Sequence, residues 1–258
     1  MSECWWADVP NYFSVSWRTL PPFERRGYAS SFYEYAVGRI ESDGRTVEMI
    51  ECGTREDKPA AIAWLEKYGF KRKNRYPNSE LVLSEFDSAQ FASYPTRAAT
   101  AGLIIKPLAE IIPHDAEWQR KLYDLEWIFE LDEPTSVPPK QEPFEDYQKN
   151  TLESPDFKPE CWFVALDGDR FAGMSCLWPD KMKSTRWNTG WTGVDRPYRR
   201  KGLAMAMKVA ALTYAQQSGV EVVKTDNHET NWMYQINLRL GFKPIPASLH
   251  YEKRMGRE

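Results

Sequence analysis

Two short stretches of this chain are nearly alike, and each precedes a similar series of elements. Residues 24–29 read ERRGYA and residues 199–204 read RRKGLA. In each case a second glycine, within LEKYGF (65–70) or LRLGF (238–242), follows about forty residues later. Because self-similarity of this kind is the mark of a repeated structural unit, the chain is predicted to contain two related halves.

Both halves predict helix, strand and helix between their two glycines. In the second half, apolar side chains recur at helical spacing from Leu203 to Tyr214, and Ser218-Gly219 ends that helix. Residues 220–225 (VEVVKT) predict a buried strand. The next helix begins after Thr230 or Asn231 and ends at Gly241. The corresponding elements of the first half are a helix from 28 to about 40, a strand at 46–52 and a helix at 58–70.

The second half is preceded by further elements that the first half has no room for. They are a strand at 102–108, helices at 115–129 and 142–153, a hairpin of 161–168 and 170–178, and a strand at 186–194. The first half adds only a strand at 12–20 and a closing strand at 79–86. The small, polar residues between the halves predict a linker. We therefore expect a partial domain at 1–88, a linker at 89–101 and a complete domain at 102–258, in a mixed α/β fold.

Composition excludes several classes of protein. Of the 258 residues, 42 % are hydrophobic and 28 % charged, which is ample for a globular core. The net charge of −3 with scattered Lys and Arg argues against nucleic-acid binding. No segment predicts a signal peptide or a membrane span, so we expect a cytoplasmic protein. The cysteines are too widely spaced for a zinc site and are predicted to be buried free thiols: Cys4, Cys52, Cys161 and Cys176.

The RRKGLA segment has the chemistry of an anion-binding turn. A strand that runs into a small-residue turn and then a helix offers free backbone N–H groups and the positive end of the helix dipole. Arg199, Arg200 and Lys201 add positive charge at the same place. The chain has no P-loop and no G-x-G-x-x-G motif, and GMSCL (173–177) lacks the second glycine of a serine-hydrolase turn. The hexamer taken alone also fits a charged helix start.

In its context the hexamer resembles the GNAT superfamily of acyl-CoA-dependent N-acyltransferases. The resemblance rests on the order strand, R-x-x-G-x-A, helix, strand, and a helix that ends in L-G-F, and it spans residues 102–258. Residues 225–242 (TDNHETNWMYQINLRLGF) resemble the second conserved helix of that superfamily. The first half resembles the same fold without its front strands. The whole chain is thus similar to tandem GNAT proteins, the arrangement of mycothiol synthase and its relatives, with a shortened first copy that is expected to be non-catalytic.

The resemblance implies which residues hold acetyl-CoA as co-substrate. The loop that cradles the pyrophosphate corresponds to Arg199–Ala204, which includes Arg200, Lys201, Gly202 and Leu203. The backbone N–H near Val194 is the implied donor to the thioester oxygen, and Asn231 and Asn237 are further cofactor contacts. Glu24 stands at the arginine position of the first copy, where it would repel a pyrophosphate. No metal is implied.

Catalytic candidates lie between residues 226 and 237. The position of the family's usual proton-donating tyrosine is occupied here by Asn237, and an amide is not a proton-donating acid at neutral pH. Tyr234, one helical turn earlier, is the predicted proton donor, and His228 or Glu229 is the predicted base. Each position has an alternative reading: a solvated His-Glu pair, a packing tyrosine, and a helix-capping Asn231.

The implied reaction is direct attack of an amine on the acetyl thioester in a ternary complex. The acceptor would lie against residues 129–146, which are rich in acids and would attract a cationic small molecule; an ordinary solvated loop also fits. The partners are then acetyl-CoA and a small amine, without nucleic acid or membrane, for a monomer or homodimer. A non-catalytic acyl-CoA-binding sensor or scaffold remains the alternative function.

Overall fold

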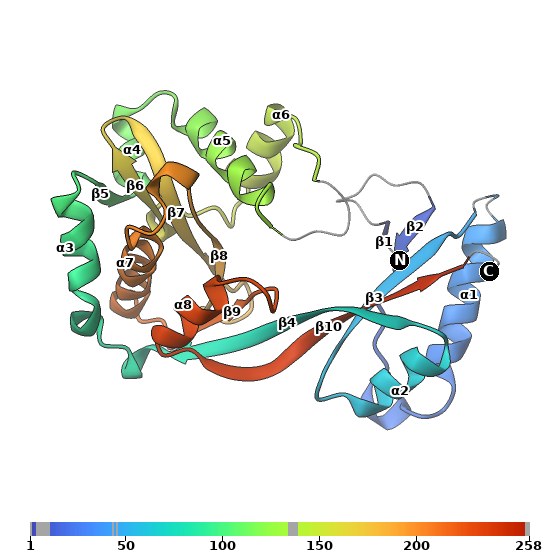
Figure 1. Ribbon diagram of the computed structural model, residues 1–258. Coiled ribbons are helices and arrows are strands. Elements are labelled where there is room, and N and C mark those ends of the chain that lie inside the picture. Colours follow the sequence, from blue (N-terminus) through green and yellow to red (C-terminus); the bar gives the residue numbers. More distant parts are fainter. Residues whose placement is uncertain (1, 4–10, 43, 45, 134–138, 256–258) are drawn as a thin grey trace. The chain divides into compact units, whose positions relative to one another are not determined.

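The computed structural model describes residues 2–3, 11–42, 44, 46–133 and 139–255, and these form two compact units (Figure 1). One unit comprises Met1–Tyr76 with Pro246–Glu258, and the other comprises Pro77–Ile245. Strands β4 (Lys71–Val82) and β10 (Lys243–Arg254) therefore contribute to both. These units differ from the predicted boundaries at 88 and 102, because the end of the chain returns to the first unit.

The first unit is a small sheet in the order β1-β2-β3-β10, with two helices. Strand β2 pairs in parallel with β3, and β10 pairs antiparallel with β3 from Ser248↔Arg55 to Arg254↔Met49. The predicted strand at 12–20 is thus shorter than expected. The element bounds are β1 Ser2–Glu3, β2 Tyr12–Ser14, η1 Pro21–Phe23, α1 Tyr28–Ser42, β3 Met49–Arg55 and α2 Pro59–Lys67.

The second unit is a mixed sheet in the order β4-β9-β8-β7-β6-β5. All neighbouring strands in this series are antiparallel except β8 and β9, which are parallel. The predicted hairpin is formed by β6 and β7 and turns at Gly168, which has a φ of +56°. The strand bounds are β5 Ile104–Pro107, β6 Trp162–Asp167, β7 Arg170–Pro179, β8 Arg186–Val194 and β9 Val222–Asp226.

The predicted helices of the second unit occur in the predicted order, and α3 (Ser93–Thr100) and the short α4 are additional to them. The predicted helix at 142–153 divides into α6 and a π-helical turn, η5. The bounds are α4 Leu108–Ile111, α5 Trp118–Glu130, α6 Phe144–Tyr147, η5 Gln148–Leu152, α7 Leu203–Gln217 and α8 Met233–Arg239. Short 3₁₀ turns connect them: η2 Leu83–Glu85, η3 Ser88–Phe91, η4 Ile112–His114, η6 Pro159–Cys161 and η7 Arg196–Tyr198.

The segment predicted as a linker is helical and packed. Residues 88–91 form η3, and Ser93–Thr100 form helix α3. The Asp87 side chain accepts a hydrogen bond from the Ala89 N–H and starts the first turn. Pro95 lies in the first turn of α3, where a missing N–H costs no helical hydrogen bond. The small residues of this segment therefore form a helix, and one of them, Ala98, is buried.

Helices cover both faces of the second sheet, and two glycines show how closely they pack (Figure 1). A Cβ at Gly173 of β7 would lie 3.0 Å from the Met207 side chain of α7. A Cβ at Gly193 of β8 would lie 2.4 Å from the ring of Phe129 on α5. Adjacent strands present Gly173 and Gly193 to opposite faces, because Met174 is the partner of Gly193. Glycine at these positions lets α5 and α7 approach the sheet.

Three cysteines are buried free thiols, as predicted. Burial raises the pKa of the Cys52 thiol to about 12 and that of Cys161 to about 12, with smaller contributions from neighbouring carboxylates. Cys4 lies outside the described residues. Within the described part of the chain, no helix has the length and apolar character needed to cross a membrane.

The first unit depends on its C-terminal strand, and this can be tested by truncating one side chain of β10. Leu249 is 3 % exposed in the first unit's core. We expect Leu249→Ala to lower the free energy of unfolding by about 2–5 kcal/mol, the usual cost of a large-to-small change in a core. Urea denaturation followed by tryptophan fluorescence measures the change. Leu20→Ala, at a position 65 % exposed, is the control and should cost far less; equal losses would contradict the assignment of β10 to this core.

Candidate functional site

The glycine turn before α7 has the backbone conformation of an anion site. Arg200 and Gly202 have φ values of +64° and +81°, and Gly202 caps the helix. The first amide with a partner inside the helix is that of Ala206, which donates to the Gly202 carbonyl at 3.0 Å. The preceding N–H groups, of Leu203, Ala204 and Met205, belong to the first turn, where a helix supplies no carbonyl partner. They are therefore suited to a negatively charged ligand.

The strand that leads into this turn separates from its parallel neighbour. The ladder between β8 and β9 runs only from Arg186↔Val222 to Asn188↔Lys224, although β8 continues to Val194. Beyond the ladder, a hydrogen bond of 2.7 Å joins the Thr189 and Thr225 hydroxyl groups. The end of β8 thus has one side that is not paired with β9.

Val194 presents its backbone to this unpaired side. Val194 lies opposite Gly173 on β7, while the next residue, Asp195, donates its N–H to the Ala172 carbonyl at 2.9 Å. In an antiparallel ladder, this makes Gly173–Val194 a non-hydrogen-bonded pair whose N–H and C=O groups point away from the partner strand. The Val194 N–H is therefore directed away from β7, and its role as a donor to the thioester oxygen stays a prediction.

The Arg199 side chain is already engaged in this structure. Its Nε donates to the Val194 carbonyl at 2.9 Å, and its guanidinium forms an ion pair with Asp132 after α5. Arg196 also donates to Asp132, at 2.9 Å. These hydrogen bonds outweigh partial burial and lower the pKa of the Asp132 carboxyl. Arg199 thus ties the glycine turn to the end of α5 instead of extending from the turn as an isolated cation.

Lys201 lies over the Tyr198 ring, with its Nζ 5.2 Å from the ring centroid. The Tyr198 hydroxyl donates to Asp167 at 2.6 Å, and Arg170 lies over the same ring at 5.5 Å. These contacts position η7, the segment that directly precedes the glycine turn.

Asn237 is fully buried and lies at the centre of an amide and hydroxyl network. Its Nδ2 donates to the Asn227 Oδ1 at 2.7 Å and to the Thr225 hydroxyl at 3.4 Å. Its Oδ1 has no hydrogen-bond partner among the described residues. Exchanging O and N of this amide would leave the other atom without a partner. Because a buried unsatisfied polar atom costs about 1–3 kcal/mol, the network is suited to accept a water molecule or a ligand group.

The other predicted catalytic residues surround the start of α8. The His228 Nδ1 lies 2.8 Å from the Thr230 hydroxyl and accepts from the Thr230 N–H at 3.3 Å. Asn231 behaves as a capping residue, since its Oδ1 accepts from the Met233 N–H at 2.9 Å. Tyr234 is partly buried on α8, while Glu229 is exposed and makes no hydrogen bond with a described residue.

The structure adds Glu133, which sequence reasoning treated only as one of several loop acids. Its Oε2 accepts from the Asn231 Nδ2 at 3.4 Å, which places the end of α5 beside the start of α8. Burial, opposed by His228 and reinforced by Asp226, raises the pKa of Glu133. A half-buried carboxylate of raised pKa binds a proton more readily than an ordinary exposed one, which is a property of a general base. No local sequence signal marks it, because its partners come from another part of the chain.

A second carboxyl group, that of Glu126, is buried on the inner side of α5. Glu126 of α5 accepts a hydrogen bond of 2.7 Å from the Tyr147 hydroxyl of α6. Burial raises the pKa of Glu126 to about 8, although the bond from Tyr147 opposes this, and Glu130 and Glu142 contribute repulsion. Burial and Glu142 also raise the pKa of Glu130. This side of the second unit therefore carries carboxyl groups that are easily protonated.

The corresponding turn of the first unit has a similar backbone. Arg25 and Gly27 have φ values of +59° and +87°, and η1 precedes them as η7 precedes Arg200 and Gly202. A Cβ at Gly27 would meet no atom within 4 Å, so this turn is open.

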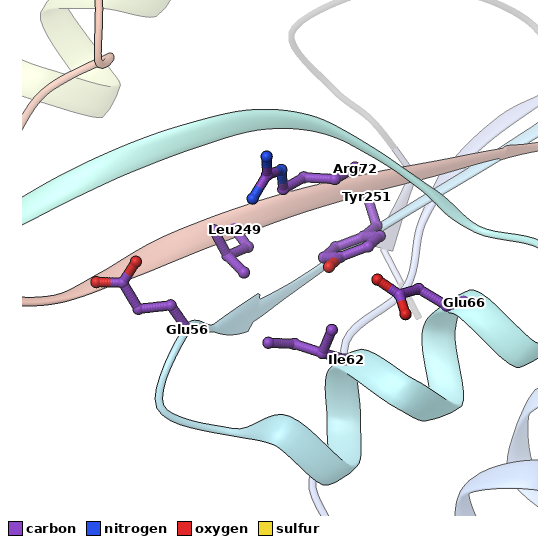
Figure 2. Close-up of a pocket in the computed structure, with 6 residues that line it drawn as sticks. All are labelled: Glu56, Ile62, Glu66, Arg72, Leu249 and Tyr251. Atoms are coloured by element: carbon purple, nitrogen blue, oxygen red, sulfur yellow. The ribbon is translucent and has the colours of Figure 1, made fainter.

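The first unit also contains a hollow of about 500 Å³ between α2 and the strands β4 and β10 (Figure 2). Its lining mixes apolar and charged groups, which are Glu56, Ile62, Glu66, Arg72, Leu249 and Tyr251. The Glu56 carboxylate is used internally, since it accepts from the Ala247 N–H at 2.7 Å and pairs with Arg75. The hollow lies away from the glycine turn in sequence and contains none of the predicted site residues.

Residues 120–242 match the model of the Acetyltransferase (GNAT) family. The matched segment is GNAT-like in sequence. It extends from α5 to the glycine-phenylalanine pair after α8, so it includes the glycine turn, the end of β8 and the buried amide network. A comparison with curated protein sequences found no match.

Solved structures show that the fold is the GNAT fold. A GCN5-related N-acetyltransferase from Sphaerobacter thermophilus is 17 % identical, with a TM-score of 0.70 over 96 % of this chain and 75 % of its own. A tandem GNAT protein from the clavulanic acid biosynthesis pathway is 18 % identical, with a TM-score of 0.72 over 97 % of this chain and 77 % of its own. A glucosamine N-acetyltransferase region of a fungal multi-domain β-N-acetylglucosaminidase is 14 % identical, with a TM-score of 0.67 over 92 % of this chain and 29 % of that protein.

The described residues contain no group of three or more His, Cys, Asp or Glu side chains suited to hold a metal ion.

The raised pKa of Glu126 predicts how the free energy of unfolding depends on pH. The folded state keeps a proton on Glu126 up to about pH 8, whereas the unfolded chain releases it near pH 4.5. The wild type therefore loses stability as pH rises through this window, by up to about 1.4 kcal/mol per pH unit. Glu126→Gln keeps an acceptor for Tyr147 and removes the titration.

We expect Glu126→Gln to become more stable relative to wild type between pH 5 and pH 8, as measured by urea denaturation at each pH. The exposed Glu145→Gln is the control and should follow the wild type. A constant difference between Glu126→Gln and wild type over this range would show that Glu126 does not bind the proton.

Proposed function

We propose that the second unit is an acetyl-CoA-dependent N-acetyltransferase that acts on a small amine. The observation that carries the proposal is the glycine turn before α7, with first-turn N–H groups next to the unpaired end of β8. The N–H groups of the first turn are donors for a pyrophosphate, and the unpaired backbone at the end of β8 is proposed to hydrogen-bond the extended arm of the cofactor. The GNAT family match over residues 120–242 supports the same conclusion.

The reaction assigned to this site is a direct acyl transfer. The neutral amine attacks the thioester carbonyl carbon, a C–N bond forms, and the C–S bond then breaks. The Val194 N–H, directed away from β7, stabilises the negative oxygen of the tetrahedral intermediate. The proton lost by the amine passes to a base, and the departing thiolate of coenzyme A takes up a proton.

Glu133 and His228 are the proposed acid–base groups on the amine side. Glu133 is half-buried and its pKa is raised, and it interacts electrostatically with His228. An amine of pKa about 10.4 is mostly protonated at neutral pH. The carboxylate therefore first attracts the ammonium form and then removes its proton, which leaves the neutral amine that attacks. Glu229 is exposed and is a weaker candidate than the sequence suggests.

The thiolate proton comes, in this proposal, from the start and middle of α8. Tyr234 is the donor, and Asn237 holds a water molecule through its unsatisfied Oδ1. Asn237 is fixed by Asn227 and Thr225, so it orients that water without itself losing a proton.

The acceptor is proposed to be cationic, as an aminosugar or polyamine is. Glu130 and Glu133 close α5 on this side, and Glu142 raises the pKa of both Glu126 and Glu130. A bound ammonium group would relieve this repulsion between like charges. The structural similarity to a glucosamine N-acetyltransferase region is compatible with an aminosugar.

The first unit is proposed to be a shortened copy that does not bind acetyl-CoA, in a tandem arrangement of the mycothiol synthase type. Its turn repeats the backbone of the second, but Glu24 replaces the leading arginine. Its α2 carries the buried, apolar Leu65 four residues before the glycine, where α8 carries Asn237.

Substitution at the two glycines tests which turn binds the cofactor. We expect Gly202→Glu to abolish acetyl-CoA binding, because it adds a negative charge and a side chain at a position with positive φ. Gly27→Glu suffers the same backbone strain and should still bind with the affinity of the wild type. Isothermal titration calorimetry gives both affinity and stoichiometry, expected to be one per chain. Loss of binding with Gly27→Glu alone would reverse the assignment.

Turnover distinguishes the enzyme from a non-catalytic acyl-CoA sensor, which the asparagine at position 237 also allows. Thiol release is followed with acetyl-CoA and a panel of aminosugars, polyamines and amino acids. We expect Glu133→Gln to lower kcat about a hundredfold or more and to change the acid limb of the pH profile, as loss of a general base does.

The exposed Glu110→Gln is the control for this experiment and should retain activity. Tight acetyl-CoA binding without turnover across the panel would favour the sensor. A selective loss in Glu229→Gln instead would identify that residue as the base.

A further inference from the structure

Helix α3 packs directly against the glycine turn. A Cβ at Gly202 would lie 3.0 Å from Cδ1 and 3.6 Å from Cε1 of the Tyr94 ring. The same Cβ would lie 3.8 Å from the Nη1 atom of Arg97. Gly202 therefore has two reasons to be glycine, its positive φ and the tyrosine ring against it. The Arg97 guanidinium lies beside the turn although it comes from a segment outside the motif.

Arg97 and Tyr94 are held in place by the core. Ala98, the next residue, is 2 % exposed and packs in one cluster with Leu203 and Met207 of α7. The Arg97 Cζ atom lies 5.5 Å from the centroid of the Tyr94 ring. The aromatic ring thus supports the guanidinium, while Arg97 itself is exposed. A supported but solvent-accessible guanidinium is well placed to meet a ligand.

Most basic side chains of the glycine turn are already engaged by other groups, which leaves a phosphate-binding role for Arg97. Arg199 is bound by Asp132 and by the Val194 carbonyl, and Lys201 lies over Tyr198. Two of the motif's three basic side chains therefore already have partners. Coenzyme A carries a pyrophosphate and a 3′-phosphate, and a guanidinium binds phosphate oxygens through two parallel hydrogen bonds.

We infer that Arg97, supported by Tyr94, binds a phosphate group of the acyl-CoA beside Gly202, so that the cofactor site is composed of α3 and α7 together. This inference rests on the proposed function of the glycine turn. It assigns a binding role to a helix that precedes the segment matched by the GNAT family model, since Ser93–Thr100 lie before residue 120.

Calorimetric titration of the full chain with acetyl-CoA tests the inference. We expect Arg97→Gln to weaken binding about three- to tenfold, as loss of one exposed charge-assisted contact would, and Arg97→Lys to recover part of the affinity. Arg239→Gln removes an exposed arginine from α8 and should bind like the wild type. Unchanged affinity in Arg97→Gln would overturn the inference.

Two further measurements make the result specific. Tyr94→Phe should bind acetyl-CoA normally, and Tyr94→Ala should bind it more weakly. Melting temperatures show whether both variants are folded. Normal binding by a folded Tyr94→Ala would contradict the supporting role of the ring. Titration with 3′-dephospho-acetyl-CoA identifies the phosphate: an Arg97→Gln effect that persists indicates the pyrophosphate, and one that disappears indicates the 3′-phosphate. Failure of the wild type to bind acetyl-CoA would instead overturn the proposed function.

Discussion

The second unit is organised around the point where β8 and β9 stop pairing. The parallel ladder ends at Asn188 and Lys224, and strands that diverge in this way leave backbone groups of β8 without a neighbouring strand. Two consequences follow from this separation. The Val194 N–H is available to a ligand, and the chain can turn sharply through Gly202 into α7 at the same end of the sheet. The glycine turn, the end of β8 and the positive end of the α7 dipole therefore lie at the same end of the sheet.

A buried hydrogen-bond network lies between the ends of these strands and α8. Thr189 and Thr225 connect the two strands just after the ladder ends, and Asn237 joins Thr225 to Asn227. Buried polar groups of this kind fix a geometry only when they are hydrogen-bonded. The first unit, in contrast, has the apolar Leu65 of α2 in its core and is held by apolar packing. The two glycine turns thus share positive φ values, whereas α2 contributes an apolar side chain to its core and α8 a buried amide.

Electrostatics joins the glycine turn to the acidic end of α5. Asp132 holds Arg196 and Arg199, while the neighbouring Glu133 contacts Asn231 at the start of α8. Consecutive residues of one loop therefore reach both the predicted cofactor turn and the predicted catalytic helix. Incoming phosphate would compete with Asp132 for Arg199, so the ion pair is a direct physical connection between the proposed cofactor and acceptor sides.

The amino-acid pattern was sufficient to predict the order of elements, the position of both glycine turns and most of the second unit. Helical periodicity, the Gly168 turn and the glycines at 202, 219 and 241 are local signals, because backbone conformation at a glycine or a cap depends on a few adjacent residues. The same locality explains the errors. Small residues at 87–101 indicated a linker, whereas burial of Ala98 and packing of Tyr94 on Gly202 made them a helix.

Contacts between distant side chains could be found only in the folded structure. Glu133 beside Asn231, Arg199 with Asp132, Arg97 beside Gly202 and the return of β10 to the first unit all join residues far apart in the chain. No spacing rule predicts such contacts, because they depend on how the sheet and its helices are packed. Local sequence thus fixed the turn that can bind an anion, and packing determined which charges surround it.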